Sequence, residues 1–497
     1  MPLLSATVAL LSFAGPSASL RLSPAAPRMS AVDAPPQQAA SPAPDAISSS
    51  APLHVLIAGG GVGGLALANC LELSDAPVTY TVLERTSEFK KFGGPIQLAS
   101  NAMQGFRSID EELYKQIEAR ATWTGNRTNG IKDGVRDEWY AKFDLRSPAE
   151  SREMPFTCVV ERPELQEILM RRTHDNLRLG AGVESYEKRS DGGVVATLQT
   201  GEQVHGDVLI GADGIWSNVR AAMTETPARG EGSGVTYSGY TASEEKPDGS
   251  SPYLQNLFEG WSPEIHDILR VTQEHEIEQR DLYDRPPSVL KPWNKGRVAL
   301  LGDAIHAMMP NLGQGGCQAL EDALVISEQL TSLSSRGDIE GALQGYRNRR
   351  LTRSAAVQGL SRFASDIIIR GFDTPAKLGF SGGKLVAENL NYAGVVTRLL
   401  QPILPVFFAV QFAFLYDGWE NKFSLKQLQI GLSIFAFGSL FLIAFAATAG
   451  SEVAFAGAFA ESILGAEALE GLSVWATEQS AAIQEVLNSL GGGPPGL

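Results

Sequence analysis

The sequence predicts an α/β fold in which a largely parallel β-sheet alternates with helices. Three observations predict it. The chain has 497 residues, of which 43% are hydrophobic, so it can bury a large core. The short apolar run 54–58 has the length and composition of a strand that is covered on both faces of a parallel sheet. A glycine-rich turn and then a helical pattern follow that run directly, as in a strand–turn–helix unit.

The first 52 residues predict a targeting leader rather than a domain. They contain four charged side chains and are otherwise rich in Ala, Ser, Pro and Leu, a composition that cannot build a packed core. The apolar run Leu3–Phe13 resembles the core of a signal peptide, and the stretch after it resembles an organelle transit peptide. The two in tandem resemble the bipartite leader of algal plastid proteins. A disordered N-terminus without a targeting role is the alternative.

The first unit of the core predicts a dinucleotide site. The strand 54–58 runs into a G-x-G-x-x-G pattern at Gly59, Gly61 and Gly64. Gly59 permits the tight turn, Gly61 lets backbone amides approach a pyrophosphate, and Gly64 lets the helix pack close to the strand. Glu84 follows the second strand, 20 residues beyond Gly64, where an acid accepts hydrogen bonds from a ribose 2′-OH. A Rossmann-type domain is therefore expected, and a glycine-rich turn without a ligand is the alternative.

Two later segments have the same strand–turn–helix character. The first is Asp207–Arg220, with Gly211-Ala212-Asp213-Gly214 at its turn. The second is Val298–Gly316, with Gly302-Asp303-Ala304-Ile305-His306 after its strand and glycines before its helix. In this order, the three motifs resemble those of the aromatic-ring-hydroxylase family of FAD-dependent monooxygenases. The resemblance implies one unit over 53–345, an FAD-binding domain interleaved with a β-sheet substrate domain.

The resemblance also implies roles for individual residues. Asp303 would bind the ribityl hydroxyls of FAD, and the helix that follows Gly313 would face the flavin pyrimidine, where negative charge collects on reduction. His306 would order the loop beneath the flavin rather than act as a general base, and Ser217 and Arg220 would support the turn at Asp213. Gln97, Pro310 and Gly313 would line the flavin. The cofactor-binding set is Gly59, Gly61, Gly64, Glu84, Arg85, Arg162, Asp213, Gly214, Gly302, Asp303, Gly313, Gly315 and Gly316.

Segments outside the cofactor motifs resemble one branch of this family, the zeaxanthin epoxidases. They are 94–102, 139–144, 236–241 and 280–285. This similarity implies epoxidation of the ring double bond of a xanthophyll through a flavin C4a-hydroperoxide. FAD and O₂ would supply the chemistry, with NADPH or reduced ferredoxin as electron donor, and no protein acid or base is required. A flavin hydroxylase of another isoprenoid or aromatic compound, or a non-catalytic FAD- or pigment-binding membrane protein, are the alternatives.

Composition and spacing argue against several other functions. The chain has 41 Lys and Arg against 56 Asp and Glu, which disfavours nucleic-acid binding. Cys70, Cys158 and Cys317 are widely spaced and are interpreted as small buried hydrophobes. The six histidines show no HExxH or HxxxH spacing, so no metal site is predicted. Ser217 lacks the GxSxG context of a hydrolase nucleophile.

One segment departs from the family pattern. Between Tyr240 and Phe258 the family builds several strands of the substrate sheet, whereas residues 241–257 here are turn-forming. Three to five strands with their loops would need roughly 30–60 residues. Either an exon is missing from the gene model, or this paralogue has lost part of its substrate wall. In the second case FAD would still bind while coupled epoxidation fails.

The C-terminal part is expected to associate with a membrane. Residues 346–428 predict a helical region, 429–450 a candidate transmembrane helix and 451–497 an Ala-, Gly- and Glu-rich tail. Ile430–Gly450 is 21 residues long without a charge, enough to cross a bilayer as a helix. Lysines precede it and glutamates follow it, which would place the main domain on the stromal face of the thylakoid membrane. A buried helix or an interfacial hairpin is the alternative.

Overall fold

The computed structural model describes most of the expected monooxygenase unit. It covers residues 45–89, 94–135, 137–237, 250–277, 282–287, 291–370, 377–381, 384–388 and 404–419. Of these, the residues from 46 onward belong to one compact unit. Most of the predicted leader, the candidate transmembrane helix 429–450 and the tail 451–497 lie outside the described residues. No helix within the described ranges is both long enough and apolar enough to cross a bilayer.

A six-stranded, mostly parallel sheet forms the centre of the unit. Its order is β15 (Asn294–Lys295), β16 (Val298–Leu300), β12 (Val208–Gly211), β1 (Leu53–Ala58), β2 (Val78–Leu83) and β8 (Leu177–Arg178). All neighbours pair in parallel except β15, which is antiparallel to β16 at one edge. In β1 every residue except His54 is buried, as expected for a central strand with both faces covered. The predicted α/β fold is confirmed.

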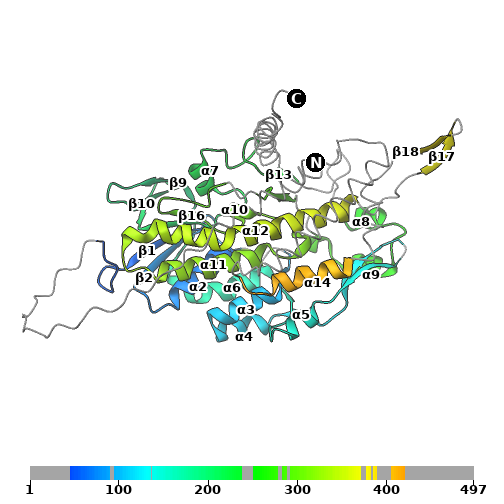
Figure 1. Cartoon of the computed structure of the whole chain (residues 1–497), viewed down its shortest axis with the longest axis horizontal. Helices are drawn as coiled ribbons and strands as arrows, with labels where there is room; N and C mark the ends of the chain where they lie inside the picture. The colour runs from blue at the N-terminus through cyan, green and yellow to red at the C-terminus, as the bar shows by residue number, and fades with distance from the viewer. Residues whose placement is uncertain are drawn as a thin grey trace, which may run out of the picture. The chain divides into compact units, whose positions relative to one another are not determined.

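Helices pack against this sheet and against one another. They are α2 (Val62–Glu72), α3 (Ser100–Ile109), α4 (Glu111–Glu118), α5 (Arg146–Glu150), α6 (Arg162–Thr173), α7 (Asn218–Thr224), α10 (Asp303–His306), α11 (Gly315–Thr331) and α12 (Ile339–Arg370). Helix α11 contacts α2, α3 and α12, and lies beside α12 along much of its length (Figure 1). A Cβ on Gly63 would lie 2.5 Å from Leu301 Cδ2 and 3.1 Å from Ala319 Cβ, so the first turn of α2 packs tightly.

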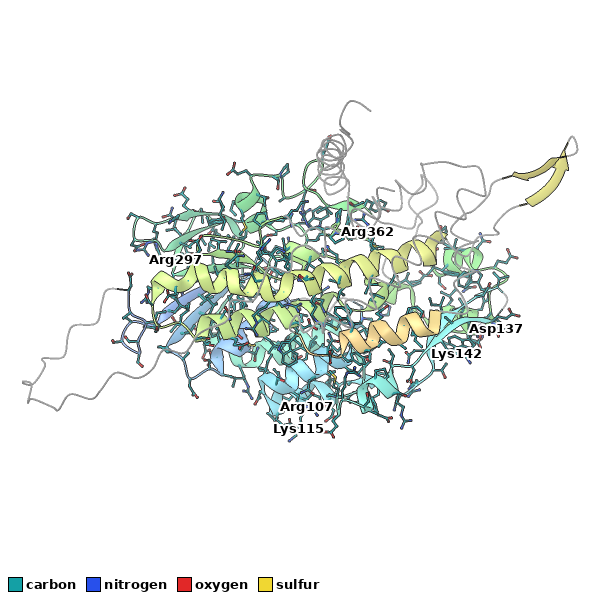
Figure 2. All side chains as sticks on the ribbon, in the orientation of Figure 1. Arg107, Lys115, Asp137, Lys142, Arg297 and Arg362 are labelled. Carbon is teal, nitrogen blue, oxygen red and sulfur yellow. The ribbon has the colours of Figure 1, made fainter. Side chains whose placement is uncertain are left out.

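Short antiparallel strands are inserted between the strands of the central sheet. They form β3–β7–β4 (Ile96–Leu98, Cys158–Val160, Thr122–Trp123), the hairpin β5–β6 (Asn129–Lys132, Trp139–Phe143), β9–β10–β11 (Val183–Lys188, Val194–Leu198, Gln203–Gly206) and β13–β14 (Thr236–Tyr237, Tyr283–Asp284). Asp137 and Lys142 mark the β5–β6 hairpin in Figure 2. Strands β3 to β7 all lie between β2 and β8 in the sequence. The sequence therefore passes into a second set of sheets and returns, which is the interleaving expected of the two layers.

The segment predicted to be turn-forming contains a helix. Residues 238–249 lie outside the described part, but α8 (Ser251–Leu257) follows, and α9 (Pro263–Val271) comes next. The Ser250 hydroxyl accepts a hydrogen bond from Tyr253 N at 3.3 Å, and Pro252 occupies the first turn. A serine N-cap followed by proline is a helix start, and the same residue types also favour turns. The interpretation of 251–257 as turns was wrong.

The ends of the described unit extend beyond the expected boundaries. Arg336 donates hydrogen bonds to the carbonyls of Ala46, Ala51 and Pro52, at 2.7–3.1 Å, so residues of the predicted leader already contact the folded unit. Helix α12 begins before residue 345 and ends after it. A hairpin of β17 (Lys377–Ser381) and β18 (Lys384–Glu388) lies within 346–428, where the sequence predicts helices.

Helix α14 (Leu404–Leu415) is the last described element, and it packs against β6. The ring centroid of Phe143 lies 4.4 Å from that of Phe408 and 6.2 Å from that of Phe412. One turn later, the Tyr416 hydroxyl lies 3.1 Å from Thr157 Oγ1, next to β7. A segment that follows the predicted FAD-binding unit is therefore part of the same core.

Candidate functional site

The glycine-rich loop lies at the carboxyl end of β1, where α/β sheets bind their ligands. Gly59 has a φ of +111°, and a Cβ there would lie 2.4 Å from Ala212 O. A Cβ on Gly64 would lie 2.0 Å from the Gly59 carbonyl oxygen. Gly61, the N-cap of α2, differs because a Cβ there would meet no atom within 4 Å. Gly59 and Gly64 are thus required by the fold, and Gly61 faces open space at a helix N-terminus.

Glu84 lies beside this loop. It follows the last residue of β2, and its carboxylate accepts hydrogen bonds from Gly60 N at 2.6 Å and from Thr86 N at 2.8 Å. The acid is therefore held at the edge of the glycine loop, as the spacing predicts. Arg85 is exposed next to it. The predicted ribose-binding carboxylate and the predicted pyrophosphate loop are side by side.

Asp303 opens the short helix α10 directly after Gly302, whose φ is +61°. Its side chain is exposed to solvent, yet the surrounding protein raises the pKa of its carboxyl, an effect opposed by the charges of His306 and Arg162. Arg162, the first residue of α6, is exposed as well and lies within electrostatic reach of Asp303.

The N-terminus of α11 is shaped by contacts with β3. Gly313 has a φ of +59°, and a Cβ there would lie 2.6 Å from Gln97 Cδ. A Cβ on Gly316 would lie 2.7 Å from Ile96 Cδ1, whereas one on Gly315 would meet nothing within 4 Å. The first turn of this 17-residue helix carries no acidic side chain. Gly315 and Gly316 are half-buried, so the N-terminal turn that carries the positive end of the helix dipole is partly exposed.

Two of the predicted residues sit at the edges of this arrangement. Gln97 lies against Gly313, where the glycine leaves room for its side chain, and its predicted place beside the flavin stays a prediction. Pro310 starts a single turn of 3₁₀ helix, Pro310–Leu312, and is exposed before α11 begins. Both residues therefore flank the partly exposed start of α11.

Asp213 has a structural task in its turn. Its Oδ2 atom accepts hydrogen bonds from Asn218 N at 2.8 Å and Val219 N at 3.2 Å, so it caps α7. Burial raises the pKa of its carboxyl. A Cβ on Gly59 would lie 3.0 Å from Asp213 Cα, which places this turn against the glycine loop, and the open Gly214 follows with a φ of +79°.

Arg220 connects the turn at Asp213 to the Asp303 segment. It is 1% exposed, and its guanidinium donates to the carbonyl of Ile215 at 2.8 Å and to that of Ala304 at 3.1 Å. The Ser217 hydroxyl accepts from Arg220 N at 2.8 Å and completes the α7 N-cap. These contacts hold the turn at Asp213, while the role of that turn beside a cofactor stays a prediction.

His306 is buried and bonded to a carboxylate. Its Nε2 atom lies 2.6 Å from Asp322 Oδ2. Burial would raise the pKa of Asp322, but His306 and Arg350 outweigh it and hold that pKa below its usual value. Because an ionised carboxylate only accepts hydrogen bonds, Nε2 must carry the proton. The side chain is thus fixed by Asp322, and its predicted role beneath a flavin stays a prediction.

Sequence reasoning missed the buried charges around Asp322. Arg350 and Arg353 of α12 are 0% and 1% exposed, and both bind Glu321, which precedes Asp322 on α11. No motif distinguishes these arginines from the solvated arginines that most helices carry. The sequence did contain one indication of a buried charge cluster: the adjacent acids Glu321 and Asp322 have apolar neighbours in a helix next to a glycine-rich turn. If such acids are buried, they need cationic partners.

The site residues fit a dinucleotide that carries a flavin. Gly61 leaves space for phosphates at the α2 N-terminus, and Glu84 is placed for a ribose. Asp303 follows β16 of the same sheet, and Arg162, which follows β7 of the β3–β7–β4 sheet, lies within electrostatic reach of it. The partly exposed N-terminus of α11 suits the part of a flavin that becomes negative. These features come from four different strand ends and all point to one ligand.

Comparisons with known proteins also indicate an FAD-binding protein. The family model "FAD binding domain" matches residues 52–256 and 262–361. The zeaxanthin epoxidase, chloroplastic, of Nicotiana plumbaginifolia is 35% identical over an alignment of 371 residues, gaps included, that covers 63% of this chain and 55% of that protein. The protein of that name from Arabidopsis thaliana is 35% identical over an alignment of 363 residues that covers 61% of this chain and 53% of that protein. The chain thus spans about half the length of the curated relatives it matches.

Solved structures share the fold. Klebsiella pneumoniae HpxO, complexed with FAD and uric acid, gives a TM-score of 0.59 at 23% identity, over 74% of this chain and 97% of that one. A salicylate hydroxylase substrate complex gives 0.53 at 20% identity, over 76% and 100%. At these identities the structures establish the fold alone, while the family model extends over more than half of the sequence. The chain therefore belongs to the FAD binding domain family and is similar to the zeaxanthin epoxidases.

Proposed function

We propose that this chain is an FAD-dependent monooxygenase that epoxidises the ring double bond of a xanthophyll, converting zeaxanthin to antheraxanthin and violaxanthin or carrying out the related diatoxanthin reaction. The observation that carries the proposal is the 35% identity to a zeaxanthin epoxidase over 371 residues. The segments 94–102, 139–144, 236–241 and 280–285 resemble the same branch and lie outside the cofactor motifs, so the resemblance supports a substrate and not only a cofactor.

The residues of the site would hold FAD along the carboxyl ends of the strands. The α2 N-terminus at Gly61 would bind the pyrophosphate, Glu84 the adenosine ribose and Asp303 the ribityl hydroxyls. Arg162 would offset the phosphate charge. The amides that open α11 at Gly315 would stabilise negative charge on the flavin pyrimidine. When bound, FAD supplies the activation of O₂.

The chain's other task is to orient the alkene and to exclude water. Epoxidation removes no proton from the substrate, so the reaction needs no protein base. The commitment of His306 to Asp322 is compatible with that chemistry. We assign the short sheets β3–β7–β4 and β5–β6 to the substrate side, and the packing of Phe143 against Phe408 and Phe412 holds the β5–β6 hairpin against the core there. An apolar, water-free chamber lets an alkene compete with decay of the activated oxygen.

We further propose that the protein works in the plastid, at the stromal face of the thylakoid membrane. The relatives are named chloroplastic, and the predicted leader and apolar C-terminal segment support the same placement. A xanthophyll dissolves in lipid, so an enzyme acting on it benefits from contact with a membrane. NADPH or reduced ferredoxin is proposed as the electron donor.

A direct assay tests the proposal. The purified, FAD-loaded full chain is given zeaxanthin in lipid vesicles with NADPH alone, or with NADPH, ferredoxin and its reductase. We expect antheraxanthin and then violaxanthin by chromatography. A protein that is fully loaded and reduced by either donor but forms no epoxide would contradict the proposal. The Gly61→Ala variant is the control, because it should fold and yet bind little FAD.

The departure at 241–257 favours one second candidate, a flavoprotein that reduces O₂ without epoxidising. Helix α8 is the described part of a segment where the family builds strands of the substrate wall. An incomplete wall would admit water and release hydrogen peroxide. The ratio of peroxide to epoxide in the same assay separates the two candidates, since coupled epoxidation predicts little peroxide per NADPH consumed.

A further inference from the structure

A buried group of charges lies where α11 meets α12. Glu321 and Asp322 on α11 and Arg350 and Arg353 on α12 are each at most 1% exposed. Arg350 Nη1 lies 2.5 Å from Glu321 Oε2, and Arg353 donates to both Glu321 oxygens at 2.7 and 2.8 Å. We call these four residues the α11–α12 charge cluster. They include two carboxylates and two guanidinium groups, so the cluster is electrically balanced.

Asp322 connects this cluster to the cofactor site. Its Oδ2 atom accepts hydrogen bonds from Gly302 N at 2.9 Å and from His306 Nε2 at 2.6 Å, and its Oδ1 atom accepts from Arg350 Nε at 2.7 Å. Gly302 is the N-cap of α10, and His306 is its last residue. One carboxylate therefore holds both ends of the four-residue helix whose first residue is Asp303.

Stability alone does not account for this arrangement. A buried ion pair contributes little net stability compared with well-packed apolar side chains of the same volume, because desolvation offsets the attraction. What a charged hydrogen-bond acceptor does supply is direction: it fixes donors at short distances and defined angles. Helix α10 has one turn and is too short to hold its own geometry. An outside anchor is needed if Asp303 is to keep one position.

We propose that Asp322 is a positioning residue for FAD binding: it fixes α10 at Gly302 and His306 so that Asp303 is presented to the ribityl chain, and Arg350 orients it. The proposal rests on the FAD-binding part of the proposed function and not on the xanthophyll substrate. It assigns a role in cofactor binding to a residue that lies beneath the site and has no contact with the ligand surface.

The test uses Asp322→Asn in the full chain. An amide of the same shape must direct its NH₂ group either at Arg350 or at the Gly302 and His306 donors, so one set of hydrogen bonds is lost. We expect the FAD dissociation constant to rise about tenfold or more, because one hydrogen bond to a charged group is lost. The constant is measured by the quenching of flavin fluorescence when FAD is titrated into the apoprotein. The visible circular dichroism of bound flavin should change as well.

Asp207→Asn is the matched control. Asp207 also accepts from a backbone N–H, that of His54 at 2.9 Å, and from an arginine, Arg336 Nε at 2.9 Å. It precedes β12, at the end of the strand opposite the cofactor motifs. The same chemical change there should leave the FAD dissociation constant within about twofold of the wild type, since no site residue moves.

A double-mutant cycle with Asp303→Ala decides whether Asp322 acts through Asp303. If it does, Asp322→Asn should have little further effect on FAD affinity once Asp303 is truncated. Equal effects in both backgrounds, or an Asp322→Asn variant that binds FAD as the wild type does, would overturn the proposal. If Asp322→Asn does not fold, the same FAD titration is made on Arg350→Lys. Lysine keeps the positive charge but lacks the planar guanidinium whose donors orient Asp322. No xanthophyll is present, so the outcome is independent of the substrate.

Discussion

Replacing Gly61 with alanine should separate cofactor binding from folding. Its backbone is extended, with φ of −77°, and an added Cβ would meet no protein atom within 4 Å, so Ala fits the apoprotein. Alanine is a poorer N-cap than glycine, which lowers the free energy of unfolding by about 1 kcal/mol or less. The methyl group does occupy the space that a pyrophosphate needs in front of the α2 amides.

The expected loss of affinity is large. A phosphate moved away from two backbone amides loses about 3 kcal/mol, because a hydrogen bond to a charged group contributes roughly 1.5 kcal/mol or more. That loss raises the dissociation constant of FAD about 100-fold. The assay is titration of apoprotein with FAD by fluorescence, together with thermal unfolding of the apoprotein followed by circular dichroism.

Gly64→Ala is the comparison in which the same change should act on the fold. Its Cβ would lie 2.0 Å from the Gly59 carbonyl oxygen, a distance that forces α2 away from β1. Overpacking of this kind costs about 3 kcal/mol of unfolding free energy. The reasoning about Gly61 is refuted if Gly61→Ala destabilises the apoprotein as much as Gly64→Ala does, or if it binds FAD as tightly as the wild type.

Three more outcomes follow from buried groups. Burial raises the pKa of the Cys158 and Cys317 thiols to about 12, so at pH 8 both should resist a thiol reagent such as DTNB until the protein is unfolded. Tyr346→Phe should lower the unfolding free energy by about 1–2 kcal/mol, since the hydroxyl donates to the Leu300 carbonyl at 2.9 Å inside the core; chemical denaturation measures it. The pKa of Asp322 is lower in the folded state than its usual value of 3.8, so the ionised carboxylate stabilises the fold at pH values above 3.8. This stabilisation is lost as the pH falls from 3.8 through the folded-state pKa. The difference in unfolding free energy between the wild type and Asp322→Asn should therefore shrink over the same pH range.

The cofactor-side features were accessible from sequence because each depends on local constraints. Gly59 needs a positive φ, Gly64 needs a close approach, and Glu84 follows a strand at a fixed spacing. Each of these requirements restricts the residue type at a single position, so a sequence motif can reveal it. The strands β1, β12 and β16 were accessible for the same reason, since each is a short apolar run before a glycine-containing turn.

Features that depend on distant partners could not be predicted. Arg350 reads as an ordinary helical arginine, and only the packing of α12 on α11 shows that it is buried with Glu321 and Asp322. Helix α8 was missed because serine and proline favour both turns and helix starts, and the local sequence does not decide between them. The contact of α14 with β6 joins residues more than 250 positions apart, beyond any local pattern.

The attachment of the C-terminal segment sets a limit on shortening this protein. Arg350 donates to the carbonyl of Trp419 and Arg353 to those of Phe414 and Leu415, while both arginines neutralise the acids of α11. A chain cut at residue 345 would remove both arginines, leaving Glu321 without these partners and Asp322 with only His306 among the charged partners described above. Autonomous folding thus depends on sequence beyond the last glycine motif, and fragments designed around the nucleotide fingerprint alone should accumulate as insoluble material.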